Sequence, residues 1–81
     1  MMIELRLPDL DLAGVPITVS AWHAAAGQRV IEGDRLVEIL AGDAVVDLPA
    51  PASGVLVKRC ALADEPLQAG QVLAIIESED E

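Results

Sequence analysis

Apolar and polar side chains alternate in short runs along the chain, and a period of two residues is typical of half-buried β-strands. In the first run, Ile3, Leu5 and Leu7 alternate with polar residues until Pro8 ends it. The pattern predicts six strands, at residues 3–7, 17–21, 35–40, 44–48, 54–58 and 71–77. Turn-forming residues separate these runs at intervals of roughly 8–12 residues, and no helical periodicity competes with them. The alternation therefore predicts an all-β sandwich or barrel.

A repeat runs through the two halves of the chain with an offset of 37 residues. Residues 30–39 and 67–76 share one pattern: an apolar residue, two spacers, a glycine, two polar or mixed residues and an apolar strand. Gly33 and Gly70 fall at matching places, where a tight turn needs a positive φ that glycine adopts without strain. The repeat predicts two similar β units related by an approximate two-fold axis.

Gly42 and Asp43 form the strongest turn signal, because they lie between the expected strands at 35–40 and 44–48. A glycine followed by Asp favours a two-residue type II′ turn or a close relative. Such a turn displays its tip residues to solvent. Two prolines within residues 48–52 lack backbone donors, so we expect this segment to be an extended edge or a crossover and not a central strand.

Composition narrows the kind of core and the kind of partner. Hydrophobic residues make up 53% of the chain, Phe and Tyr are absent, and Trp22 is the only aromatic residue. The core must be aliphatic, with Trp22 as a packing anchor, and offers no stacking platform for bases. A formal net charge of −9 argues against nucleic acid and anionic membranes as partners. The same charge keeps a small domain soluble, and a partner bound through charge is expected to be locally basic.

The ends of the chain and its single cysteine indicate the expected compartment and the extent of the domain. No basic-then-apolar leader opens the chain, and no apolar run approaches the roughly 18–20 residues of a spanning helix, so we expect a cytoplasmic protein. Cys60 is the only cysteine, which excludes an internal disulfide, and we interpret it as a small apolar filler. The β domain is expected to span residues 1–77, followed by residues 78–81 as a solvated acidic tail.

Polar residues elsewhere form no recognisable site. His23 has no second His or Cys at metal spacing, and Asp9 with Asp11 is too short a series for a calcium loop. The serines lack the setting of a nucleophile: Ser20, Ser53 and Ser78. Four aspartates could bring two carboxylates together, but a small aliphatic domain has little room for a catalytic pocket: Asp34, Asp43, Asp47 and Asp64. We expect no catalytic residue and no metal site.

Read together, these segments resemble the biotinyl/lipoyl attachment domain. In that family an alternating strand leads to a Trp or similar residue, Gly-Asp-like pairs and an apolar strand. A modified lysine at a hairpin tip and a run like Val-Val-Glu-Val-Pro-Ala-Pro follow. The corresponding segments are residues 17–22, 27–28, 30, 33–34, 36–39, 44–51, 54–57, 67, 70 and 72–76. The resemblance covers residues 3–77 and implies a flattened eight-stranded barrel-sandwich hybrid of two pseudo-symmetric four-stranded halves.

The chain departs from the family pattern at the hairpin tip. A lipoyl domain has Asp-Lys-Ala there and a biotinyl domain has Met-Lys-Met. When residues 44–46 are matched to the family's post-lysine residues, Asp43 takes the place of the lysine, between Gly42 and Ala44. A carboxylate cannot form the amide that attaches lipoate or biotin, and no lysine lies between residues 38 and 48. The resemblance therefore implies no attached cofactor.

Lys58 is the only lysine in the chain and hence the alternative attachment residue. It falls within the expected strand at 54–58, where the repeat pairs it with Ala21, and not at a hairpin tip. A solvated cation that offsets nearby carboxylates is the simpler interpretation of its role.

Three functions follow from the resemblance and its departure. The first is a non-enzymatic interaction or accessory module related to 2-oxo acid dehydrogenase or biotin-dependent complexes, with a dehydrogenase or carboxylase component as its protein partner. The second is a working carrier that bears lipoate or biotin on Lys58 or through an unusual linkage. The third is a structural subunit of an oligomer that uses its acidic face or the edge strand at 3–7. The sequence leaves the oligomeric state and the choice between lipoyl and biotinyl ancestry open.

Overall fold

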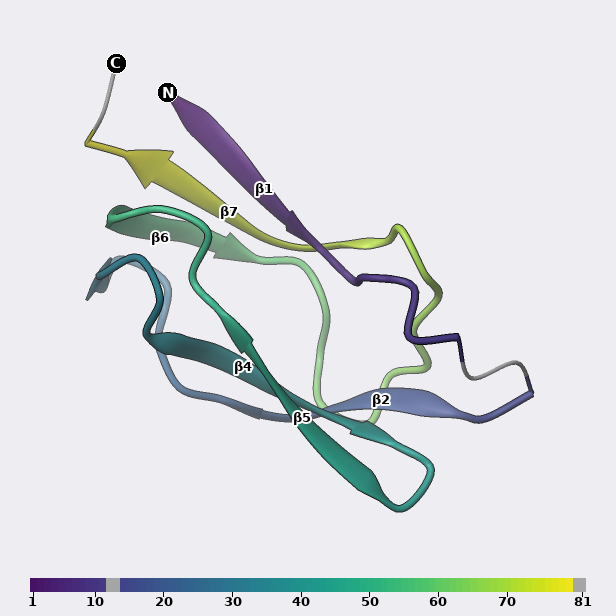
Figure 1. Cartoon of the computed structure of the whole chain (residues 1–81). Coiled ribbons are helices and arrows are strands. Elements are labelled where there is room, and N and C mark those ends of the chain that lie inside the picture. The colour runs from purple at the N-terminus through teal and green to yellow at the C-terminus, as the bar shows by residue number, and fades with distance from the viewer. Residues whose placement is uncertain (12–13, 80–81) are drawn as a thin grey trace.

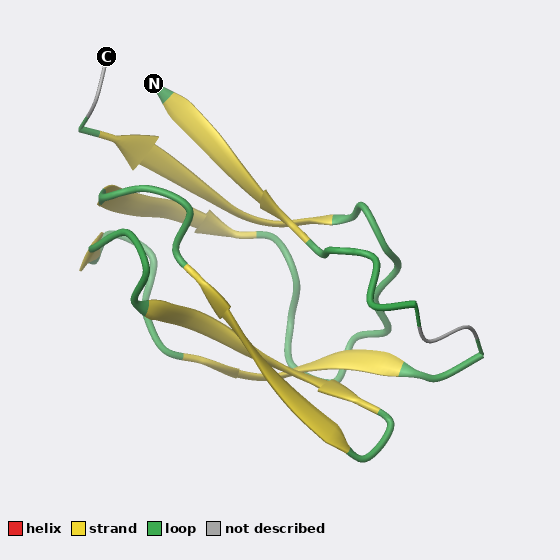
Figure 2. Ribbon diagram, viewed as in Figure 1, coloured by secondary structure: helices red, strands yellow, loops and turns green. Residues whose placement is uncertain are grey.

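A computed structural model describes residues 1–11 and 14–79, which form seven β-strands and no helix (Figures 1 and 2). The strands are β1 (Met2–Arg6), β2 (Ile17–Trp22), β3 (Arg29–Val30), β4 (Arg35–Ala41), β5 (Ala44–Pro49), β6 (Gly54–Arg59) and β7 (Val72–Ser78). Each of the six expected strands is present, with its ends within one residue of the expected ends. The alternation missed β3, because two residues are too few to show a period. No helix among the described residues is long and apolar enough to cross a bilayer.

The strands form two antiparallel sheets that face each other across the core. One sheet has the order β1-β7-β6-β3 and the other β2-β4-β5 (Figure 1). β5 is an edge strand and ends at Pro49, as the missing backbone donors of residues 48–52 predict. The chain then crosses to the other sheet and enters β6 at Gly54. The all-β, two-sheet fold expected from the sequence is confirmed.

The 37-residue repeat reappears in the strand registers. In β2–β4 Val19 pairs with Ile39, and 37 residues later in β6–β7 Leu56 pairs with Ile76. The other Cα partners of these two ladders correspond in the same way, and so does the bulge in each ladder. The bulge inserts Ser20 in the first half and Val57 in the second. The two halves therefore share register as well as sequence pattern.

The eighth strand implied by the family resemblance is reduced to a single bridge. β3 pairs Arg29 with Val55, and the equivalent pair 37 residues away is the isolated bridge between Pro66 and Thr18. Proline has no N–H to give to a ladder, so pairing is shorter here than at Arg29. The Leu67 N–H still donates to the Ile17 carbonyl at 2.8 Å. The described residues thus hold seven strands and one bridge at the place of the eighth.

The core is aliphatic, as the composition requires. It consists of two clusters of buried Leu, Ile, Val and Ala residues, and it contains no buried polar side chain among the described residues. Val19, Ile39, Leu56 and Ile76 are fully buried, so the residues paired by the repeat are also the centre of the core. Trp22 is half-buried and packs against both clusters. It therefore acts as the expected packing anchor.

The C-terminal strand is longer than expected. The tail was expected from residue 78, but Ser78 belongs to β7 and its N–H donates to the Met1 carbonyl at 2.7 Å. The Glu79 N–H donates to the Ser53 carbonyl at 3.0 Å, and its carboxylate pairs with Arg29. Residues 78 and 79 are thus held by Met1, which precedes β1, and by Ser53, which precedes β6. Residues 80–81 of the expected tail lie outside the described residues.

Candidate functional site

The tip of the β4–β5 hairpin consists of Gly42 and Asp43, with a paired alanine on each side. Gly42 has a φ of 59°. Among the described non-glycine residues only Asp11 and Asp64 have positive φ, so Asp43 lies in the negative-φ region. Positive φ at the first central residue alone is the type II′ turn that a Gly-Asp pair favours. The tip lies at the opposite end of the molecule from the N- and C-termini (Figure 1).

The surroundings of the tip combine a carboxylate with apolar side chains. Asp43 is exposed, and no cation of the described residues lies within ion-pair distance of it. Leu40 and Val45 form the second cross-strand pair from the tip, and their exposed fractions are 38% and 58%. Among the described residues, the hairpin thus presents a carboxylate without an ion-pair partner near two exposed aliphatic side chains.

Lys58 lies away from any turn. It is exposed on β6, a central strand of its sheet, and pairs with Ile75 on β7. It is the repeat equivalent of Ala21 on β2, since both residues follow the bulge in their ladders. The structure therefore separates the only lysine from the displayed hairpin tip.

His23 belongs to a small ionic cluster on the β2-β4-β5 sheet. Its Nε2 lies 3.3 Å from Asp47 Oδ1, and Arg35 Nη1 lies 3.6 Å from Asp47 Oδ2. About a third of the Asp47 side chain is exposed, so these pairs are partly screened and contribute little stability individually. The cluster links the end of β2, the start of β4 and β5. It has the character of a structural contact.

The remaining polar residues singled out from the sequence are dispersed. Ser53 Oγ accepts a hydrogen bond from the Glu32 N–H at 2.9 Å, which ties two loops together. Asp9 accepts one from the Asp11 N–H at 2.8 Å in a local turn. Cys60 is half-buried with a free thiol. Across the described residues, no group of three His, Cys, Asp or Glu side chains is placed to hold a metal ion.

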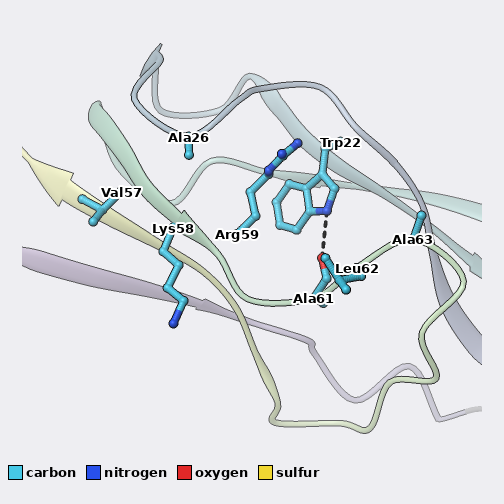
Figure 3. Close-up of a pocket in the computed structure, with 8 residues that line it drawn as sticks. All are labelled: Trp22, Ala26, Val57, Lys58, Arg59, Ala61, Leu62 and Ala63. Atoms are coloured by element: carbon cyan, nitrogen blue, oxygen red, sulfur yellow. Dashed lines mark hydrogen bonds between the residues drawn. The ribbon is translucent and has the colours of Figure 1, made fainter.

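A hollow beside Trp22 was not predicted from the sequence. The Arg59 guanidinium lies 5.8 Å from the centre of the indole ring, and the indole N–H donates to the Ala61 carbonyl at 3.0 Å (Figure 3). Trp22 and Arg59 are 37 residues apart, so they are equivalent positions of the repeat. That spacing was the available signal, because equivalent residues near a two-fold axis can meet each other.

Comparison with known proteins indicates the same family as the fold does. The family model described as "Biotin-requiring enzyme" (Biotin_lipoyl) matches residues 3–76. The chain is 32% identical over its whole length to the dihydrolipoyllysine-residue succinyltransferase component of the 2-oxoglutarate dehydrogenase complex of Haemophilus influenzae. It is 27% identical, again over its whole length, to the dihydrolipoyllysine-residue acetyltransferase component of the pyruvate dehydrogenase complex of Corynebacterium glutamicum.

A third relative extends the range of complexes. The chain is 30% identical over 88% of its length to the lipoamide acyltransferase component of the branched-chain alpha-keto acid dehydrogenase complex of Pseudomonas aeruginosa. The match spans 20%, 12% and 15% of the three relatives, so it concerns one domain of much longer proteins. The family match over residues 3–76, the two-sheet fold and its internal repeat together show that the chain belongs to the biotinyl/lipoyl domain family.

Proposed function

We propose that this chain is a non-enzymatic member of its family that has lost the attachment residue and works through protein contacts. The observation that carries the proposal is the exposed Asp43 at the tip of the β4–β5 hairpin, where the family pattern has its modified lysine. Attachment of lipoate or biotin needs an amine that becomes an amide nitrogen. A carboxylate at this position cannot supply one, so neither cofactor is bound at the tip.

The proposed partner is a component of a 2-oxo acid dehydrogenase or biotin-dependent complex. The similarity to components of three dehydrogenase complexes supports this class of partner. Leu40 and Val45 offer apolar contact area, and Asp43 adds charge, so the complementary surface is apolar with a local positive charge.

Intact-mass measurement on protein isolated from its native host tests the loss of attachment. We expect the unmodified mass. In a parallel reaction with purified lipoate or biotin ligase, the wild-type chain should remain unlabelled and Asp43→Lys should become labelled. A modified mass in the native protein would contradict the proposal.

Lys58→Arg distinguishes the alternative carrier function, which rests on the exposed position of the only lysine. If the wild-type chain is labelled and Lys58→Arg abolishes the label, the chain is a carrier that uses Lys58. Label retained in Lys58→Arg would indicate another linkage, to be located by peptide mapping. A third possibility, a structural subunit, predicts concentration-dependent sedimentation that Asp43→Lys leaves unchanged.

A further inference from the structure

The hollow beside Trp22 has a volume of ≈ 440 Å³ and lies where the two halves of the fold meet (Figure 3). This volume falls within the range of about 300–1,000 Å³ that is usual for small-molecule sites. Trp22 at the end of β2 and Arg59 at the end of β6 provide its centre, and the loops that follow these two strands provide its rim. Its lining residues are Trp22, Ala26, Val57, Lys58, Arg59, Ala61, Leu62 and Ala63.

The charge of the lining is opposite to that of the chain. The chain carries 14 acidic residues, yet none of those in the described part of the chain lines the hollow, while two of its five basic residues do. Figure 3 shows the Arg59 side chain next to the indole, with the Lys58 ammonium directed away from it. Arg59 is therefore the charged group of the lining that lies beside the indole, and a guanidinium in this position attracts an anion.

Arg59 has donors to offer. Arg6, Arg29 and Arg35 each lie beside a carboxylate, but no carboxylate of the described residues is within ion-pair distance of Arg59. Its contact is the face of the Trp22 ring, a cation–π arrangement that holds the guanidinium in place. Because no carboxylate of the described residues occupies them, the guanidinium N–H groups can bind a carboxylate ligand through two parallel hydrogen bonds.

The rest of the lining is apolar and partly exposed. Leu62 has an exposed fraction of 70% and Val57 one of 43%. The exposure of Val57 follows from the β6 bulge, because Val57 is the extra, unpaired residue that the bulge adds to the strand. An aliphatic chain lying on the indole, Leu62 and Val57 would remove this apolar surface from water.

We infer that this hollow binds an aliphatic monocarboxylate of medium chain length, with the carboxylate on Arg59 and the hydrocarbon chain over Trp22 and Leu62. The inference concerns a surface separate from the hairpin tip. It stands whether or not Asp43 prevents cofactor attachment.

Octanoate is the probe, and the full 81-residue chain is the sample. Because Trp22 is the only aromatic residue, its fluorescence reports this surface alone. We expect a saturable fluorescence change with octanoate, a weaker affinity for butyrate and no saturation with acetate. Octanol and octylamine should bind at least about tenfold more weakly, because neither forms the charge-assisted pair with Arg59.

Two variants test the site, one at the residue that binds the carboxylate and one at a residue that contacts the hydrocarbon chain. The NMR resonance of the Trp22 indole N–H provides a readout that does not depend on fluorescence intensity. Arg59→Gln should weaken octanoate binding about tenfold, whereas Arg35→Gln, a matched loss of a surface guanidinium, should not change it. Leu62→Glu should abolish binding without a folding penalty, since Leu62 is exposed, and Val45→Glu on the other sheet is its control. Equal affinity for octanol, unchanged affinity in Arg59→Gln or Leu62→Glu, or no saturation with octanoate would overturn the inference.

Discussion

The N–H of Gly42 donates a hydrogen bond to the carbonyl oxygen of Pro16 across 3.1 Å. This bond ties the tip of the β4–β5 hairpin to the segment that enters β2. Val15 lies so close that a Cβ on residue 42 would be 2.9 Å from its Cγ1. The turn therefore requires glycine at position 42 for two reasons, its positive φ and its close neighbour, whichever residue follows it.

Replacing Gly42 should cost stability, whereas replacing Asp43 should not. We expect Gly42→Ala to lower the free energy of unfolding by about 1–3 kcal/mol, because the side chain strains a φ of 59° and presses on Val15. Asp43→Ala should stay within about 0.5 kcal/mol of wild type, since Asp43 is exposed. Urea unfolding followed by Trp22 fluorescence measures both. Equal losses in the two variants would show that the turn has no special need for glycine.

The need for glycine at position 42 also limits how the family's Asp-Lys-Ala motif can be introduced into this hairpin. Asp43→Lys keeps the glycine and should become a ligase substrate in a folded domain. Adding Gly42→Asp completes the Asp-Lys-Ala motif but places a side chain against Val15, so the double variant should be less stable by about 1–3 kcal/mol. Labelling rates and unfolding curves of both variants test this. If neither is labelled while both are folded, a lysine at the tip is not sufficient for recognition by the ligase.

Gly54 at the start of β6 should be the least replaceable glycine. A Cβ there would overlap the carbonyl oxygen of Glu77 and lie 2.8 Å from its carbonyl carbon, and both belong to a backbone that cannot move away alone. We expect Gly54→Ala to lower the free energy of unfolding by about 3 kcal/mol. Gly27→Ala is the control: it has no neighbour within 4 Å and should lose only about 1 kcal/mol from its positive φ. A smaller loss at Gly54 than at Gly27 would contradict the close-approach argument.

Replacing Asp64 by glycine should stabilise the domain. Its φ is 65°, and its repeat equivalent, Gly27, has a φ of 90°. Each N–H donates to the neighbouring sheet, from Asp64 to Val19 and from Gly27 to Leu56. We expect Asp64→Gly to raise the free energy of unfolding by about 0.5–1 kcal/mol, because glycine has no Cβ and adopts this left-handed conformation without strain. Asp43→Gly, at a negative φ, should give no gain, and a gain of equal size there would remove the conformational explanation.

The aliphatic core should respond sharply to loss of volume. Leu56 is fully buried at the centre of one sheet, and we expect Leu56→Ala to cost about 2–5 kcal/mol through lost burial and the cavity it leaves. Leu62→Ala removes the same atoms from an exposed position and should change stability by less than about 0.5 kcal/mol. Thermal unfolding followed by circular dichroism compares the two. Similar costs would mean that Leu62 is buried in solution.

Local sequence patterns predicted most of the strand positions. Alternation of apolar and polar residues located six of the seven strands, because a side-chain period of two follows directly from strand geometry. Gly33 and Gly70 have φ values of 92° and 84°, as their places in the repeat predict. The Gly-Asp pair likewise predicted the hairpin and its turn type. Each of these properties depends on a few neighbouring residues.

Contacts between distant residues decided the rest. The short strand β3 exists because Arg29 meets Val55, and the eighth strand is shortened because Pro66 has no N–H to share. Ser78 joins β7 and Glu79 is held beside Ser53 because Met1 and Ser53 accept their backbone N–H groups. The hollow formed because the two-fold repeat brings Trp22 and Arg59 together across 37 residues. The sequence alone determined strands, turns and the residue displayed at the hairpin tip, while tertiary packing decided which surfaces face one another, since such contacts join residues that no local pattern connects.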